Sequence, residues 1–186
     1  MGCFLCLVLG CLSGCGEREN HPSSTRFTAL SAAHTGVDFR NYIRETDSLN
    51  VLGFEYIFNG GGVGLADLNG DTLPDLILAG NQTPTELYLN RGDLQFEKIT
   101  ASAGLQPAAT YWTTGVAVGD LNGDGLQDIH LASISPRRGG GAPNQLFLHQ
   151  GTDADGRPHF REVALTAGLA DTAYVTQVAF LDYDRD

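Results

Sequence analysis

Cysteine is absent from the chain after residue 15, and basic residues are scarce throughout it. The 186 residues carry 11 basic and 22 acidic side chains, a formal net charge of −11. A field of that sign repels polyanions, and the only adjacent basic pair, Arg137-Arg138, lies in a glycine-rich stretch, so we expect no nucleic-acid binding. All four cysteines fall within the first fifteen positions, at Cys3, Cys6, Cys11 and Cys15.

The chain also lacks recognisable catalytic motifs and long apolar runs. The HExxH, nucleophile-elbow and phosphate-loop patterns do not occur in it. Its most apolar stretch, "MGCFLCLVLGCLSGC" at residues 1–15, is too short to cross a bilayer as a helix but suits a signal-peptide core. Glycine is abundant, at 24 residues, which favours turns over long helices.

The end of this apolar stretch, Leu12-Ser13-Gly14-Cys15, resembles the bacterial lipoprotein box. The resemblance implies a signal peptide at 1–15, lipidation of Cys15 and an exported lipoprotein of the outer membrane or cell surface, held to the membrane only by its lipid. No Lys or Arg precedes the apolar run, which departs from the pattern, so an ordinary cleaved signal or a buried strand stays open. The polar residues 16–26 are predicted to form a tether.

What the chain does contain is a repeat. The stretch "GVGLADLNGDTLPDLILAG" at 62–80 aligns with "GVAVGDLNGDGLQDIHLAS" at 115–133. Further on, "ELYLNRGDLQFEKITASAGL" at 86–105 aligns with "QLFLHQGTDADGRPHFREVALTAGL" at 145–169. The second copy is longer only between its apolar stretches, as expected of a repeated unit with a fixed core.

Each copy has the apolar pattern of four short strands separated by Gly, Asn, Asp and Pro. Four antiparallel strands make one blade of a β-propeller. We therefore predict an all-β fold: a partial β-propeller with about two complete four-stranded blades, at 54–105 and 111–169, and the start of a third from residue 174. The whole repeat region is 27–186. The stretch "FTALSAAHTGV" at 27–37 repeats the fourth-strand pattern, so we expect a strand there that either completes a ring or stays unpaired.

Side-chain oxygens recur at alternate positions after the first strand of each copy. Because alternate residues of a tight loop turn inward, these oxygens and a carbonyl near position 7 can surround a cation, and Ca²⁺ takes ~6–8 hard oxygen donors. Without a cation, carboxylates packed so closely repel one another. Numbered from the first aspartate, positions 1, 3, 5 and 9 are Asp67, Asn69, Asp71 and Asp75 in one loop, and Asp120, Asn122, Asp124 and Asp128 in the other.

Two other kinds of loop share part of this pattern. An EF-hand needs a Glu at position 12 and flanking helices, but position 12 is Leu78 or Leu131 and the flanks are predicted strands. A metal-free hairpin turn stays open, because Asn-Gly and Asp-Gly form turns by themselves. Thr72 stands where the second loop has Gly125, so the first loop is expected to be more strained and to bind its cation less tightly.

With these residues in view, "FNGGGVGLADLNGDTLPD" and "GVAVGDLNGDGLQD" resemble FG-GAP/VCBS repeats, the calcium-bearing blades of the integrin-α-type β-propeller. The resemblance covers residues 27–186 and extends to large exported VCBS-repeat proteins of bacteria. It implies Ca²⁺ at the loop oxygens named above and a role in recognition or adhesion, with a protein or carbohydrate ligand.

A third loop begins at the end of the sequence. Asp182, Asp184 and Asp186 fall on its positions 1, 3 and 5, after "TQVAFL", the counterpart of "TGVAVG". A propeller has ~4–8 blades, so we expect the chain to be the N-terminal part of a longer protein. Alone it should be poorly soluble, because an unfinished blade exposes a strand edge and an apolar face.

Two classes of function follow. The first is a calcium-binding, non-catalytic propeller of the bacterial cell envelope, used for binding or adhesion; the alternative is part of a propeller enzyme acting on polysaccharide, such as a lyase or hydrolase. Among single residues, His130 stands where the first copy has Ile77 and is expected to pack in a strand. Trp112 is expected in the core more than on a sugar platform, and Arg91-Gly92-Asp93 is expected to form an ordinary turn.

Overall fold

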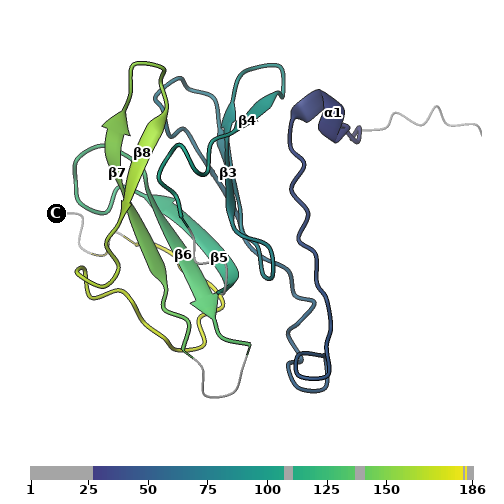
Figure 1. Cartoon of the computed structure of the whole chain (residues 1–186). Helices are drawn as coiled ribbons and strands as arrows, with labels where there is room; N and C mark the ends of the chain where they lie inside the picture. The colour runs from purple at the N-terminus through teal and green to yellow at the C-terminus, as the bar shows by residue number, and fades with distance from the viewer. Residues whose placement is uncertain (1–26, 107–110, 137–140, 182, 184–186) are drawn as a thin grey trace, which may run out of the picture.

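The computed structural model describes residues 27–106, 111–136, 141–181 and 183. Among these residues, the strands form two four-stranded antiparallel sheets, each ordered as in the chain (Figure 1). The predicted all-β fold of two four-stranded units is confirmed, and the sheets are consistent with propeller blades. The first sheet comprises β1 (Val63–Ala66), β2 (Asp75–Leu78), β3 (Glu86–Asn90) and β4 (Phe96–Lys98); the second comprises β5 (Trp112–Gly119), β6 (Asp128–Ile134), β7 (Gln145–Thr152) and β8 (Pro158–Glu162).

The two predicted loops join the first and second strands of their sheets at the same register. Ala66 pairs with Asp75 beside the first loop, and Gly119 pairs with Asp128 beside the second. Each loop therefore connects the two strands of a β-hairpin, and the second strand begins at the position-9 aspartate. Since the hairpins match, the sequence repeat is also a structural repeat.

One apolar core extends across both sheets. Its fully buried members include Ile77 and Leu87 from the first sheet and Ile129 and Phe147 from the second, each of which stabilises the fold by roughly 1.5–3 kcal/mol when buried. At Gly64 the two sheets come close together, since a Cβ there would lie 2.7 Å from a methyl carbon of Val116. The small residues of the repeat therefore allow β1 to pack against β5.

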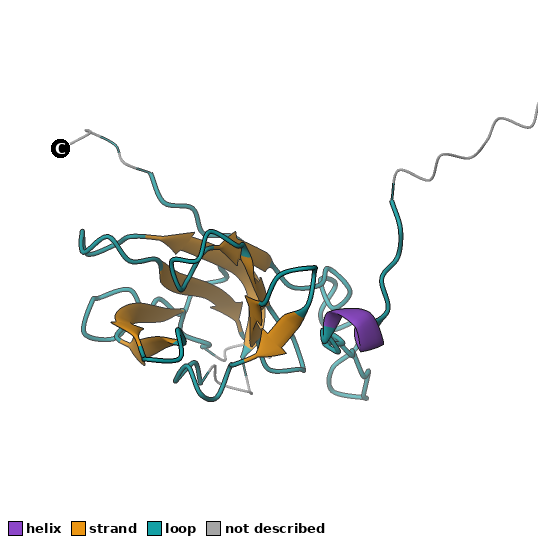
Figure 2. Ribbon diagram, turned by 90° about the horizontal axis from the view of Figure 1, so that it is seen from above, coloured by secondary structure: helices purple, strands orange, loops and turns teal. Residues whose placement is uncertain are grey.

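The strand expected at 27–37 is not formed, and that prediction was wrong. Residues 32–35 are instead a short helix, α1 (Ala32–Thr35), whose N-cap Ser31 accepts the His34 N–H and whose C-cap Gly36 has φ 75°. The helix lies at the edge of the molecule beside the first sheet (Figure 2). The aligned residues 100–104 also follow their strand as a turn, ending at Gly104 with φ 72°. The sequence similarity thus reflects shared turn chemistry, because no neighbouring strand is paired with residues 27–31.

The described residues of the predicted third blade, 174–181, contain no assigned strand but lie along β5. The Thr114 hydroxyl donates to the Val175 carbonyl at 2.7 Å, and a Cβ at Gly119 would lie 3.1 Å from the ring of Phe180. Within the described part of the chain, no helix has the length and apolarity needed to span a membrane. The predictions for residues 1–26, including Cys15, and for Asp182, Asp184 and Asp186 concern positions outside the described residues.

Candidate functional site

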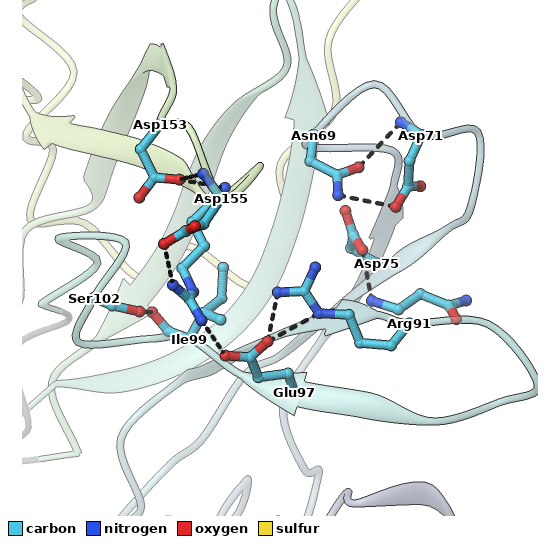
Figure 3. A network of polar contacts seen from close by, with 11 residues as sticks. Asn69, Asp71, Asp75, Arg91, Glu97, Ile99, Ser102, Asp153 and Asp155 are labelled. Carbon is cyan, nitrogen blue, oxygen red and sulfur yellow. Dashed lines mark hydrogen bonds and ion pairs between the residues drawn. The ribbon is translucent and has the colours of Figure 1, made fainter.

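The two loops adopt one conformation, position by position. In both, Oδ1 of the position-1 aspartate accepts the N–H of position 4, at 2.7 Å in the first loop and 2.8 Å in the second, and Oδ2 accepts the N–H of position 6 at 2.8 Å. The position-3 asparagine accepts the N–H of position 5 at 3.1 Å and donates its amide to the position-5 carboxylate. Figure 3 shows this pair for Asn69 and Asp71.

The position-9 aspartates lie inside the protein. Asp75 and Asp128 each have no exposed surface. One oxygen of each accepts the N–H of position 2 in its own loop, at 2.9 Å for Asp75 and 3.0 Å for Asp128. The other oxygen accepts, at 2.8 Å, a backbone N–H from the third strand of the same sheet, from Asn90 or His149. Each buried carboxylate therefore fastens its loop to the sheet.

Among the described residues, no cationic side chain forms an ion pair with an aspartate of either loop. Burial raises the pKa of the Asp75 carboxyl, and the carboxylates of Asp71 and Asp67 raise it further, while the N–H groups of Asn90 and Leu68 oppose the shift. In the second loop, N–H groups lower the pKa of Asp120.

The loops fit Ca²⁺ by the chemistry of their donors. A carboxylate has about four lone-pair sites, and the loop N–H groups occupy only part of them, so oxygens at positions 1, 5 and 9 can still accept a cation. Over the ranges that the structure describes, no three His, Cys, Asp or Glu side chains are gathered as a preformed metal site. Binding would therefore require these side chains to turn toward a common point.

The loops differ at position 6. Thr72 has φ 72° and the aligned Gly125 has φ 84°. A β-branched residue is strained in this left-handed region, whereas glycine adopts it freely. The expected strain in the first loop is confirmed; its effect on affinity stays a prediction.

Both loops border one cleft, of about 550 Å³, between the two sheets. Asp67 to Gly70 line one side and Gly125 to Gln127 the other, with His149 between them. The His149 ring accepts the Gly151 N–H on Nδ1 at 2.8 Å, so its proton is on Nε2, which donates to the Leu68 carbonyl at 2.9 Å. His149 thereby joins the second sheet to the first loop.

A second polar connection joins the sheets on the exposed surface (Figure 3). The Glu97 carboxylate of β4 accepts from Arg91 across the β3–β4 turn and from Arg157 of the β7–β8 turn, the latter at 2.9 Å. These two guanidinium groups, Arg91 first, lower the pKa of Glu97. Arg91 is thus held within its own sheet, which agrees with the expected turn at Arg91-Gly92-Asp93.

Comparison with known protein families identifies the same repeated loops as part of a known repeat. Residues 67–131, which contain both loops, match the FG-GAP-like repeat. This part of the chain is thus an FG-GAP-like repeat region. The matched range begins at Asp67 and ends within β6, so it includes the whole connection between the two hairpins.

The chain is also similar to cartilage acidic protein 1 of two vertebrates. It is 27% identical to the Xenopus tropicalis protein over 135 residues, which are 73% of the chain and 19% of the relative. It is 29% identical to the Homo sapiens protein over 127 residues, which are 68% of the chain and 18% of the relative. The chain thus spans about a fifth of the length of these relatives.

Sequence reasoning found the loop oxygens but not His149. In the first sheet the aligned residue is Asn90, whose Oδ1 accepts the Gly92 N–H at 2.9 Å and whose amide donates to the Pro74 carbonyl of the first loop. His149 likewise accepts the N–H of the glycine two positions on, and its longer side chain also reaches the Leu68 carbonyl of the other sheet. The difference between Asn90 and His149 at one repeat position is the sequence feature that could have indicated this contact. Trp112 and His130 are buried, as expected.

Proposed function

We propose that this chain is a calcium-stabilised, non-catalytic part of a β-propeller that serves binding or adhesion at the cell envelope. The observation that carries the proposal is the repeated loop: two sequences 53 residues apart adopt the same hydrogen bonds and present the same oxygen donors. A turn needs no carboxylate at three of its positions, whereas a hard cation does. The absence of catalytic motifs from the sequence supports a binding role.

Calcium would act on stability through these loops. Each loop holds three carboxylates that form no ion pair with any described residue, and a bound divalent cation would offset most of that charge. Since such a site exists only in the folded chain, Ca²⁺ would favour the folded state by mass action. The loops would then order the face of the molecule on which the cleft opens.

Isothermal titration calorimetry of the full chain with CaCl₂ tests this proposal. We expect one ion per described loop, with Kd in the extracellular range of roughly 10⁻⁴–10⁻³ M, and a melting temperature that falls when EDTA is added. Asp124→Ala should remove binding at the second loop. Asp47→Ala is the matched control, because Asp47 is exposed and lies outside both loops. A titration without heat, together with a melting curve indifferent to EDTA, would reject calcium binding.

The envelope location rests on the lipoprotein box and has its own test. Expressed with its N-terminal residues in a bacterial host, the chain should enter the membrane fraction, and Cys15→Ala should leave it unprocessed or release it. Cys11→Ala is the control, because it removes a cysteine but not the predicted lipidation site. A mature N-terminus without lipid at another residue, found by mass spectrometry, would contradict lipidation.

A further inference from the structure

A second hollow, of about 390 Å³, lies where corresponding segments of the three repeats meet. Asn59, Trp112 and Tyr174 line it, and each stands eight residues before the first aspartate of its loop. Thr114 and Thr176, which also line it, correspond to each other in the second and third repeats. These residues lie before or at the start of the first strands, whereas the cleft between the loops lies where the first strands end. The hollow is therefore separate from the candidate calcium loops.

Aromatic side chains form its walls. Trp112 is only 2% exposed and is held by Phe54, whose ring meets it edge to face at 5.3 Å. Tyr56 and Tyr174, in contrast, are 49% and 60% exposed. The buried tryptophan thus gives a rigid back wall, and the two tyrosines offer accessible ring faces at the rim.

Uncommitted polar groups lie beside these rings. The side chains of Asn59 and Thr176 make no hydrogen bond with any other described residue. The Thr114 hydroxyl, however, is already engaged with the Val175 and Ala132 carbonyls. Among the residues that the structure describes, no charged side chain lines the hollow. It therefore offers apolar faces and neutral hydrogen-bonding groups in a volume typical of small-ligand sites.

We propose that this hollow binds a neutral saccharide, with a sugar ring against Tyr56 or Tyr174 and its hydroxyls on Asn59 and Thr176. A pyranose presents an apolar face of C–H groups and a rim of hydroxyls, which matches rings flanked by an amide and a hydroxyl. An anionic ligand is disfavoured, because none of the described residues that line the hollow is cationic and the chain carries a net charge of −11. The inference rests on the proposed binding role and gives it a ligand class, but it does not require calcium.

Trp112 supplies the readout, since it is the single tryptophan of the chain. The full chain would be titrated with maltose, cellobiose and diacetylchitobiose, with polygalacturonate as the acidic probe, and Trp112 fluorescence followed. We expect saturable binding of at least one neutral sugar in the millimolar range. Tyr174→Ala should weaken it about tenfold or more, and Tyr174→Phe should retain it because the ring face remains. Tyr42→Ala is the control, because Tyr42 is exposed but lies outside the hollow.

Each outcome decides the matter. Failure of all three neutral sugars to shift the fluorescence would overturn the proposal, as would binding that Tyr174→Ala leaves unchanged. Preferential binding of polygalacturonate would overturn the neutral ligand class. Circular dichroism of each variant separates lost folding from lost binding, and Tyr56→Ala provides a second test if Tyr174→Ala does not fold. Sugar binding without calcium heat would reject only the calcium proposal, and calcium heat without sugar binding would reject only this one.

Discussion

His130 is a buried polar residue whose position in the repeat otherwise belongs to an apolar one. Its side chain is 5% exposed, and neither ring nitrogen has a hydrogen-bond partner among the described residues. It pairs across the sheet with Ala117 and Leu146, and the Phe180 ring lies 6.1 Å away. Burial lowers the pKa of His130, with no charged neighbour contributing. The neutral ring is therefore the form that fits the core.

This burial predicts a stability that depends on pH. Because the folded pKa lies below the unfolded value of about 6.5, the unfolded chain binds the extra proton, and stability falls as pH drops below that value. One histidine contributes at most about 1.4 kcal/mol per pH unit. His130→Ile, which installs the residue of the first repeat, should reduce the loss between pH 7 and 5 in urea unfolding. His34→Ile is the control, because His34 is exposed. Equal losses in wild type and His130→Ile would contradict the assignment.

At the scale of elements, the sequence predicted what local chemistry determines. Both hairpin loops and the strands around them follow from the spacing of aspartate, asparagine and glycine, and they formed where expected. The segment at 27–37 has the apolar pattern of a strand but does not form one, because a strand also needs a partner strand. The turn at Gly36 corresponds to the turn at Gly104, because both approach a neighbouring strand closely. A Cβ at Gly36 would lie 2.4 Å from the Phe96 carbonyl oxygen, and a Cβ at Gly104 would lie 2.9 Å from the Phe160 carbonyl oxygen. Each turn thus packs on the fourth strand of the next unit.

Two corresponding glycines isolate this packing. Gly104 and Gly168 share φ 72°, but only Gly104 has a neighbour within 4 Å of its missing Cβ. Gly168→Ala should lower the free energy of unfolding by roughly 1–2 kcal/mol, because alanine is strained in the left-handed conformation. Gly104→Ala should cost about 1–3 kcal/mol more, because its methyl group meets the Phe160 carbonyl oxygen. Urea unfolding of both variants measures the difference, and equal losses would show that the turns do not pack between units.

At the scale of the whole molecule, the two units are joined by contacts that the sequence did not reveal. The core crosses both sheets, Glu97 meets Arg157 on the surface, and His149 meets the Leu68 carbonyl. The last pair is 81 positions apart in the chain. Repeat alignment compares equivalent residues, so it predicts each loop but not which residue of one unit reaches the next. The oxygens of the site were therefore predictable, whereas the connection between its two halves was not.

His149 contacts the Leu68 carbonyl through Nε2 and the Gly151 N–H of its own turn through Nδ1. Two substitutions can separate these two contacts. His149→Asn should keep the acceptor for the Gly151 N–H, as Asn90 does in the first sheet, but is too short to reach Leu68. His149→Gln can place an amide N–H near the Leu68 carbonyl but loses the acceptor on the short side. We expect His149→Asn to speed amide exchange in residues 67–75, and to lower stability by roughly 1–3 kcal/mol because a buried carbonyl loses its donor.

Hydrogen exchange followed by mass spectrometry distinguishes these effects without added calcium. His149→Gln should leave exchange in residues 67–75 near the wild-type rate while loosening the turn at Gly151, the reverse of His149→Asn. A purely local role would instead leave the first loop unchanged in both variants. The His149 backbone N–H donates to Asp128 of the second loop, and its ring donates to the Leu68 carbonyl of the first loop. If His149 links the units in this way, calcium binding at one loop should change the calcium affinity of the other. A calcium titration of His149→Asn should then show the two loops filling independently.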